Sequence, residues 1–275
     1  MLTIIPRNKF KELINNIVED QTTTRFDLND FKEFIKQTEY SKNAGGLDLF
    51  FDIKDYMKTH NVKYIGQGSS RLAFFMPSGS LPDKSMPCCL KVAINPAGYA
   101  QTKAEIATFN KYTDLTCFPK MFDYNKDGKY IITEFGERID YKYIDTYTHF
   151  WNRVVLNNID SSSKCVFTNE FTGANAIMEF IRQFNSRYAT NRFNGYLDDV
   201  YDDLYNNIIQ PISEKYHKYT SLRDMIKFAK NDELTNFTFI DLCADDNWGL
   251  VCRENELVPM PIDWGLTNEV ADKYY

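Results

Sequence analysis

The spacing of apolar residues changes at Lys63, and this change restricts the fold more than any other feature of the sequence. Before it, PRNKFKELINNIVEDQ and DFKEFIKQTEY place apolar residues at helical intervals, and Asp27, Asn29 and Asp30 offer N-caps to the second stretch. DLFFDIKDYMKTH reads as a third helix or as a transition from helix to strand. After Lys63, VKYIGQGSSRLAFFMPSG is typical of two strands around a glycine turn, and CCLKVAIN is typical of a further strand.

The rest of the chain predicts a second change, back to helices. NPAG is typical of a turn, and QTKAEIATFNKYTD has the apolar spacing of a helix. FPKMFDYNKDGKYIITEFG predicts two strands around a turn at 125–128. Beyond 137 the sequence is mostly helical and polar up to about 236, and short strands and turns close it. We therefore expect an α+β fold with a helical extension over 1–58, a strand-rich lobe over 59–137 and a helical lobe over 138–275.

Composition and charge argue against several classes of protein. The chain has 275 residues, of which 43% are hydrophobic and 15% aromatic, so it can bury a sizeable core. A net charge of −6 argues against a broad nucleic-acid surface, and no apolar run is long enough to predict a membrane helix. Pro6 and the charges after it stand where a signal peptide needs apolar residues, so we expect a cytoplasmic protein. Six Cys without a CxxC pair and three scattered His argue against a zinc site or a disulfide framework.

The first candidate residues for chemistry lie in the strand-rich region. Gly66 and Gly68 let the backbone approach a phosphate group closely, although the same pattern also forms a plain hairpin. Lys91 interrupts an apolar strand and needs an anionic partner if it is buried, and Glu105 follows fourteen positions later in a predicted helix. An ammonium held in this way suits phosphate oxygens. The alternatives are a lysine at the sheet edge that reaches water and a glutamate on a solvated helix face.

The second group of candidates lies near the end of the sequence. Asp241 follows the apolar run FTFI, and Asp263 follows the apolar run VPMPI. If the segment between them forms a hairpin, Asn247 and Asp263 come near each other at the same end. Carboxylate and amide oxygens suit Mg²⁺, and Asp241 would act beside them as a base or as a group that orients an attacking hydroxyl. The alternative is that these residues only form turns.

The order of these features resembles that of the protein-kinase-like superfamily. A glycine turn, a strand Lys, a helix Glu, a strand pair, helices, Asp followed by Asn, and Asp-aromatic-Gly occur in this order. More narrowly, YIGQGSSRLAF, LKVAINPAGYAQTKAE and DNWG…PIDWG are similar to the small kinase-like proteins of tailed bacteriophages, over about Tyr64 to Leu266. The resemblance implies a bilobal fold with a strand-rich N-lobe and a reduced helical C-lobe, preceded by the helical extension.

The resemblance also implies a role for each matching residue in binding ATP and Mg²⁺. Lys91 would contact the α- and β-phosphates and pair with Glu105, and Asp241 would be the catalytic-loop Asp. The glycine turn would cover the phosphates, and a hinge after the strand pair would hold adenine through backbone groups. The remaining residues implied are Gly66, Gly68, Ser69 and Ser70 for the turn, Thr133 for the gatekeeper, Glu134 to Gly136 for the hinge, Asp263 with Asn247 or Asp246 for the metal, and Trp264 and Gly265 for the Asp-aromatic-Gly motif.

The sequence departs from the family pattern in four places. Arg71 stands where the third glycine of the turn is expected, and Phe239-Ile240 replaces the His-Arg of the catalytic loop. Asn247 lies six positions after the catalytic-loop Asp instead of five, so that Asp246 or Asn247 would be the metal ligand. Ten residues follow Gly265, too few for a full activation segment and peptide-binding helices. This last departure weighs against a protein substrate more than against ATP binding.

Two functions from different classes are compatible with these features. The first is a compact, atypical phosphotransferase that uses MgATP on an unknown acceptor, with nucleotidyl transfer as a variant on the same fold. The second is a pseudokinase or phage accessory protein that binds a host or virion partner, supported by the altered catalytic loop and the aromatic, Asn-rich region from Tyr141 to Tyr219. A phage-encoded chain would act in the host cytoplasm or in the virion.

Overall fold

The computed structural model describes residues 26–38, 47–81, 85–138, 247–253 and 256–275, and also Asp224 and Phe228. The chain divides into two compact units. The first comprises Met1–Lys111, Lys120–Phe135 and Asp272–Tyr275, and the second comprises Tyr112–Pro119 and Gly136–Ala271. Each unit contains an antiparallel sheet, and helices accompany the sheets, so the described residues have the expected α+β class.

The first unit holds a five-stranded sheet in the order β1-β2-β3-β5-β4. Two of the helices predicted before the strands lie in the described residues, and the stretch that fitted a third helix or a transition from helix to strand is helix α3. The elements are α2 (Leu28–Gln37), α3 (Leu47–Thr59), β1 (Lys63–Gln67), β2 (Arg71–Met76), β3 (Cys88–Ala93), α4 (Pro96–Lys111), β4 (Met121–Tyr124) and β5 (Tyr130–Glu134).

The inner strands of this sheet pair regularly, whereas the two edge strands do not. The β2–β3 and β3–β5 pairs keep one register along their length. The β1–β2 pairing shifts between Tyr64 and Gly66, and the β4–β5 pairing shifts between Met121 and Asp123. The central strand β3 is therefore the best-fixed strand, because a regular ladder holds it on both sides.

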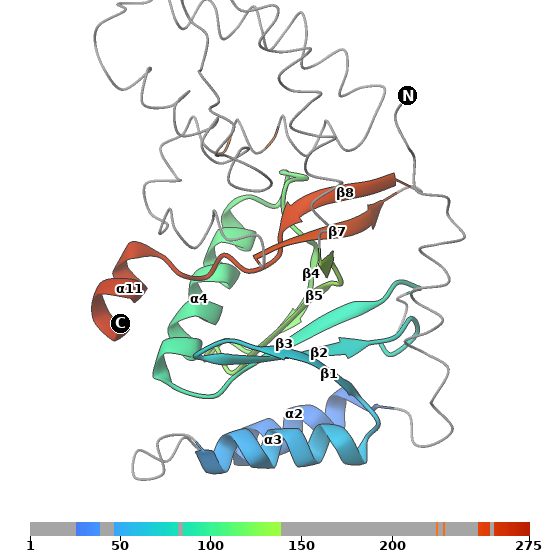
Figure 1. Cartoon of the computed structure of the whole chain (residues 1–275), viewed down its shortest axis with the longest axis vertical. Helices are drawn as coiled ribbons and strands as arrows, with labels where there is room; N and C mark the ends of the chain where they lie inside the picture. Colours follow the sequence, from blue (N-terminus) through green and yellow to red (C-terminus); the bar gives the residue numbers. More distant parts are fainter. Residues whose placement is uncertain are drawn as a thin grey trace, which may run out of the picture. The chain divides into compact units, whose positions relative to one another are not determined.

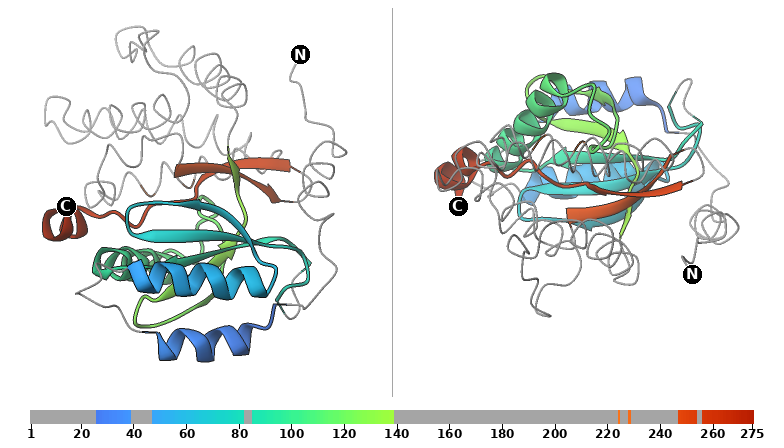
Figure 2. Two further views of the ribbon diagram at one scale, coloured as in Figure 1. Left: turned by 60° about the horizontal axis from the view of Figure 1, so that its bottom comes forward. Right: turned by 90° about the horizontal axis from the view of Figure 1, so that it is seen from above.

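The two faces of the five-stranded sheet carry different side chains, because strand residues alternate between them. One face packs against α2 and α3 and forms one apolar core with them, while α4 lies on the other face (Figures 1 and 2). The core residues of the first face are Leu72, Phe74 and Met76 of β2, Cys88, Leu90 and Val92 of β3, Tyr130 and Ile132 of β5, Phe31 and Ile35 of α2, and Leu49, Ile53 and Met57 of α3.

Helix α2 is capped at its start and bound to the sheet at its end. The Asp27 carboxylate accepts hydrogen bonds from the backbone N–H groups two and three positions later, as the sequence predicted. Lys129 donates to the carbonyl oxygens of Ile35 and Thr38 at 2.8 and 2.9 Å. The two described helices of the extension, α2 and α3, pack on the strands. The helix predicted over 6–21 lies outside the described residues.

Helix α4 begins earlier than the sequence predicts. NPAG is not a separate turn, because the helix starts at Pro96 and the Asn95 side chain caps it by accepting the backbone N–H of Gly98. Proline suits the first helical position, where an N–H would have no partner within the helix. Gly98 is required by packing, since a Cβ there would lie 2.2 Å from the carbonyl oxygen of Ser70. The start of α4 therefore lies very close to the glycine turn.

The second unit holds a three-stranded sheet in the order β6-β7-β8. Its strands are β6 (Glu137–Arg138), β7 (Trp248–Arg253) and β8 (Glu256–Pro261), so the hairpin expected before Asp263 is present. Gly136 and Gly249 allow close packing, since a Cβ on them would lie 2.5 and 2.8 Å from a methyl carbon of Ile262. Helix α11 (Asn268–Tyr274) follows, and the chain passes from the second unit to the first within it.

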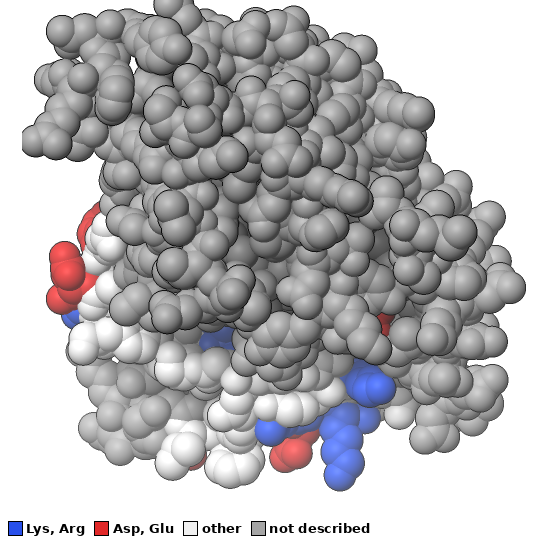
Figure 3. Space-filling model, turned by 45° about the horizontal axis from the view of Figure 1, so that its top comes forward, with Lys and Arg blue, Asp and Glu red and all other residues white. Residues whose placement is uncertain are grey.

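The helical region expected between 138 and 236 lies outside the described residues, apart from Asp224 and Phe228. None of the helices that the structure describes is long and apolar enough to cross a bilayer. Over the described residues of the face in Figure 3, basic and acidic side chains both occur.

Candidate functional site

Lys91 lies on β3, the central strand of the five-stranded sheet, and reaches the α4 face. Its Nζ lies 3.0 Å from Oε1 and 3.3 Å from Oε2 of Glu105 on α4. The exposed fraction is 6% for Lys91 and 0% for Glu105. An edge lysine that reaches water and a glutamate on a solvated helix face, the two alternatives from the sequence, are therefore both wrong.

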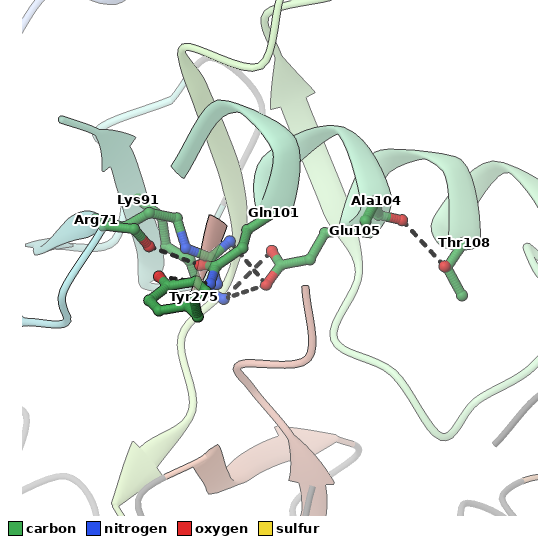
Figure 4. Close-up of polar contacts among 8 residues, drawn as sticks. Arg71, Lys91, Gln101, Ala104, Glu105, Thr108 and Tyr275 are labelled. Carbon is green, nitrogen blue, oxygen red and sulfur yellow. Dashed lines mark hydrogen bonds and ion pairs between the residues drawn. The ribbon is translucent and has the colours of Figure 1, made fainter. Parts of the chain in front are cut away.

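Arg71 joins this pair as a second cation. It is the first residue of β2, and its Nη1 lies 2.9 Å from Glu105 Oε1, an ion-pair distance without the angle of a hydrogen bond. Only 5% of Arg71 is exposed, so it is as buried as Lys91. Figure 4 shows the two cations reaching the carboxylate from the sheet. We call Arg71, Lys91 and Glu105 the charged cluster; it includes the residue that replaces the third glycine of the family pattern.

The glycine turn between β1 and β2 contains two glycines that packing against the described residues does not explain. A Cβ on Gly66 or Gly68 would have no described atom within 4 Å, and neither residue has a positive φ. Gly98 differs, because its own packing against the turn requires glycine. Open space beside the backbone of Gly66 and Gly68 is what a closely bound group such as a phosphate needs.

Ser69 and Ser70, the second half of the turn, are attached to the start of α4. The Ser69 carbonyl oxygen accepts a hydrogen bond from Asn95 Nδ2, and the Ser70 carbonyl oxygen accepts one from the backbone N–H of Ile94, both at 3.0 Å. The buried Ser70 hydroxyl donates to Gln101 Oε1 at 2.7 Å. The Ser70 side chain is therefore already used within the chain, whereas Ser69 is exposed.

The positions implied for the gatekeeper and the start of the hinge lie at the end of β5. Thr133 and Glu134 are buried. The Thr133 hydroxyl donates to the carbonyl oxygen of Glu134, and the Glu134 carboxylate accepts the backbone N–H of Lys120 at 2.7 Å. These contacts fix the end of β5 within the first unit. Gly136 belongs to the second unit, where its lack of a side chain makes room for Ile262.

The β7–β8 hairpin brings Asn247 and Asp263 together at one end. The carbonyl oxygen of Asn247 accepts the backbone N–H groups of Ile262 at 2.7 Å and Asp263 at 3.2 Å. One carboxylate and one amide oxygen fit the preference of Mg²⁺ for hard oxygen ligands, and leave positions for phosphate and water. Among the residues that the structure describes, no group of three or more His, Cys, Asp or Glu could hold a metal alone. Asp241 and Asp246 lie outside the described residues.

Trp264, the aromatic residue after Asp263, is buried in the second unit. Its ring stacks on Phe118 with the centroids 4.2 Å apart and the planes 15° apart, and Phe228 meets Phe118 edge-on. Arg253 holds the same segment by donating to the carbonyl oxygen of Phe118 at 2.8 Å. The loop that carries Asp263 is thus fixed through the residue next to it.

Two titratable groups in or beside these segments have shifted ionisation. Burial raises the pKa of the Glu137 carboxyl at the start of β6. Burial first, and then the charge of Asp224, raises the pKa of the Cys117 thiol well above its usual range. Cys117 is therefore a poor nucleophile at neutral pH, since the thiolate is the reactive form.

Sequence reasoning identifies Lys91 and Glu105 but misses the residues around them. From the sequence, Arg71 was noted only because it replaces the third glycine of the family pattern. Strand alternation and pairing nevertheless place it on the same sheet face as Lys91. Gln101 lies four positions before Glu105, a spacing that predicts one shared helix face. No local pattern reveals Tyr275, because its partners are far away in the sequence.

Comparisons with known proteins give only distant similarity. No protein-family model matches the sequence, and no curated protein matches it. The solved streptomycin–ATP–APH(2″)-IIa ternary complex is 14% identical, with a TM-score of 0.29, over 90% of this chain and 73% of that one. Choline kinase from Cryptosporidium parvum Iowa II is 13% identical, with a TM-score of 0.30, over 75% of this chain and 59% of that one.

A third solved structure, the Plasmodium vivax ethanolamine kinase, is 11% identical, with a TM-score of 0.32, over 88% of this chain and 70% of that one. Two of the three proteins are thus described as kinases, and the other is described in complex with ATP. TM-scores of this size do not assign a fold or an activity, so neither is carried over to this chain.

Proposed function

We propose that this chain is a compact kinase-like phosphotransferase that binds MgATP. The observation that carries the proposal is the buried ion pair between Lys91 on β3 and Glu105 on α4, in the same unit as the open glycine turn. In protein kinases a strand lysine held by a helix glutamate is required for phosphoryl transfer. Well-packed apolar residues often stabilise a protein as well as a buried ion pair does, so stability alone gives little reason for the pair.

In the proposed site, the first unit holds the phosphates. The Lys91 ammonium donates to phosphate oxygens while Glu105 fixes its position, and Gly66 and Gly68 leave space for the phosphates beside the backbone. The hinge from Glu134 to Gly136 holds adenine through backbone groups, and Thr133 is the gatekeeper.

The metal ligands and the base are proposed in the second unit. Asn247 and Asp263 offer oxygen donors for Mg²⁺, which neutralises phosphate charge when bound. Asp241 is proposed to orient the attacking hydroxyl and to accept its proton. The terminal phosphoryl group moves from ATP to that hydroxyl oxygen, the bond to the β-phosphate oxygen breaks, and ADP leaves.

The proposed fold is that of the protein-kinase-like superfamily, with a strand-rich N-lobe and a reduced helical C-lobe. It is supported by the element order β1-β2-β3-α4-β4-β5 in the first unit and by the hairpin that precedes Asp263 in the second. The narrower resemblance to kinase-like proteins of tailed bacteriophages stays a prediction, and so does a location in the host cytoplasm or the virion.

Thermal unfolding with and without MgATP tests the nucleotide site. A ligand at one hundred times its Kd adds about 2.7 kcal/mol to the folded state, which raises the Tm by roughly 5 to 10 °C for a chain of this length. We expect this shift in the wild type and its loss in Lys91→Met, where the replacement is apolar and of similar length. Lys63→Ala removes an exposed lysine from β1 and should keep the shift.

The remaining outcomes separate the metal site and the chemistry. Asp263→Ala should lose the Mg²⁺-dependent part of binding or turnover while it keeps its Tm without ligand, and normal turnover would contradict the metal assignment. No Tm shift in the wild type would contradict the nucleotide site itself. If MgATP raises the Tm but no ADP forms when hydroxyl-bearing acceptors are supplied, the result would instead favour a pseudokinase that acts by binding a partner.

A further inference from the structure

The hydroxyl of Tyr275, the residue after α11, is bonded both to the glycine turn and to α4. It lies 2.8 Å from Ser69 Oγ, and Gln101 Nε2 donates to it at 3.2 Å. Gln101 Oε1 accepts the Ser70 hydroxyl at 2.7 Å. All four residues belong to the first unit. The Tyr275 hydroxyl therefore completes a chain of hydrogen bonds that runs from Ser70 through Gln101 and back to Ser69.

The Gln101 amide gives this chain a direction. Its oxygen can only accept and its nitrogen can only donate, so the Tyr275 oxygen accepts from Gln101 and its own proton remains available for Ser69 Oγ. Gln101 is buried, with 8% exposed. Tyr275 is itself 64% exposed, and phenylalanine in its place would remove the acceptor for the part-buried Gln101 nitrogen and the partner for the exposed Ser69 hydroxyl.

The network also joins the turn to the charged cluster. Gln101 and Glu105 are four positions apart on α4 and lie on the same side of the helix, beside Lys91 and Tyr275 (Figure 4). The first half of the turn has open space at Gly66 and Gly68, whereas the second half is held. Tyr275 is one of the groups that hold it, and it reaches the turn from outside the β1–β2 hairpin.

We propose that Tyr275 is a positioning residue that keeps the Ser69–Ser70 half of the glycine turn against α4 and thereby increases the affinity for the terminal phosphates of a nucleoside triphosphate. The inference rests on the proposed function, because it assumes that the turn covers those phosphates. A turn that is already held in place loses less conformational freedom when the phosphates bind.

Amide hydrogen exchange without any ligand tests whether Tyr275 holds the turn. Tyr275→Phe should speed exchange at the amides of 68–71, where the backbone N–H of Gly68 donates to the carbonyl oxygen of Arg71. Tyr274→Phe, which removes a hydroxyl from the neighbouring exposed residue of α11, should leave exchange there unchanged. Equal exchange rates in the wild type and in Tyr275→Phe would overturn the inference, whatever the affinity of either protein for nucleotide.

Calorimetric titration with MgATP and with adenosine then tests the link to phosphate. Loss of one or two hydrogen bonds predicts that Tyr275→Phe weakens MgATP binding by about tenfold. Adenosine affinity should not change, because adenosine carries no phosphate. Ser69→Ala should lower the affinity for MgATP less than Tyr275→Phe does. In a protein that already carries Tyr275→Phe, Ser69→Ala should lower the affinity by less than it does in the wild type, since the two side chains share one contact.

The two proposals fail in different ways. If the wild type binds neither MgATP nor adenosine, the proposed function fails and the phosphate role of Tyr275 fails with it. If the wild type binds MgATP but Tyr275→Phe binds it equally well, only the role of Tyr275 is overturned. The same holds if Tyr275→Phe lowers the affinity for adenosine as much as the affinity for MgATP. Faster exchange in the turn together with a selective loss of MgATP affinity supports it.

Discussion

The two faces of the five-stranded sheet are built from the same inner strands, yet they bury different chemistry. The face under α2 and α3 buries aliphatic and aromatic side chains in one continuous core. The face under α4 also buries apolar side chains, such as Phe75 and Ile131, but adds two cations and a carboxylate, the charged cluster. An apolar face stabilises the sheet by removing surface from water, whereas a buried ion cluster is weak evidence for stability. The difference fits the proposal that the charged cluster on the α4 face serves the phosphotransferase function, while the other face contributes to stability alone.

The largest effect is expected from Glu105→Ala. It leaves Arg71 and Lys91 buried without the carboxylate that both contact, which should lower the free energy of unfolding by about 3–5 kcal/mol in urea titrations. The matched variant replaces all three residues by apolar ones, with Arg71→Met, Lys91→Met and Glu105→Leu. It should keep or exceed wild-type stability and lose the MgATP shift. Normal MgATP binding by this triple variant would remove the functional distinction between the faces.

Substitutions on the apolar face should change the stability of the protein but not its affinity for MgATP. Ile53 is fully buried on α3, so Ile53→Ala should lower the free energy of unfolding by about 2–5 kcal/mol and Ile53→Val by about 0.5–1.5 kcal/mol. The Kd for MgATP, measured well below the Tm of each variant, should stay at the wild-type value. A loss of affinity as large as that of Lys91→Met would show that the two faces are not separable.

A smaller effect is expected where α2 begins. Asp27→Ala removes the acceptor for two backbone N–H groups and should lower the free energy of unfolding by about 0.5–2 kcal/mol. Asp27→Asn keeps an acceptor of the same shape and should stay near the wild type. If both variants unfold like the wild type, α2 is held by its core residues and by Lys129, without help from its cap.

The smallest effect is a pH dependence at the α2–α3 side. Burial first, and then the charges of Asp30 and Asp27, raise the pKa of Tyr56 to about 12. Its usual pKa is about 10, so the unfolded chain ionises first and the stability present below pH 10 is lost as pH rises from about 10 to 12. Tyr56→Phe should flatten the fall of Tm in this range, when each variant is compared with its own Tm at pH 7. Identical alkaline curves would contradict this assignment.

Local features of the sequence predicted local parts of the structure well. The cap at Asp27, the strand–turn–strand at the glycine turn, the β4–β5 hairpin and the hairpin before Asp263 all follow from residues a few positions apart. The predicted start of α4 was wrong, because NPAG is compatible both with a turn and with a capped helix that has proline in its first turn. Only the close packing of Gly98 against Ser70 distinguishes the two.

Long-range partners were harder to predict. The sequence offered Glu105 as a partner for Lys91, and the resemblance implied the same pair, but a strand lysine at a sheet edge remained an alternative. Burial of Arg71 depends on the central position of β2 and β3 in the sheet, which no local pattern specifies. The hydroxyl of Tyr275 meets Ser69 from a distance of 206 positions, and a tyrosine hydroxyl gives no signal of its partner in the sequence.

The register shifts at β1 and β4 have a consequence for how the protein behaves at high concentration. Both strands lie at the edges of the five-stranded sheet, and exposed edges invite another chain to add a strand. On β1, the exposed Tyr64 and Ile65 would favour such stacking. The irregularity between Tyr64 and Gly66, and the one on β4, bend or twist the strand and break the regular row of edge groups. We therefore expect both irregularities to lower the tendency of the sheet to add strands from another chain.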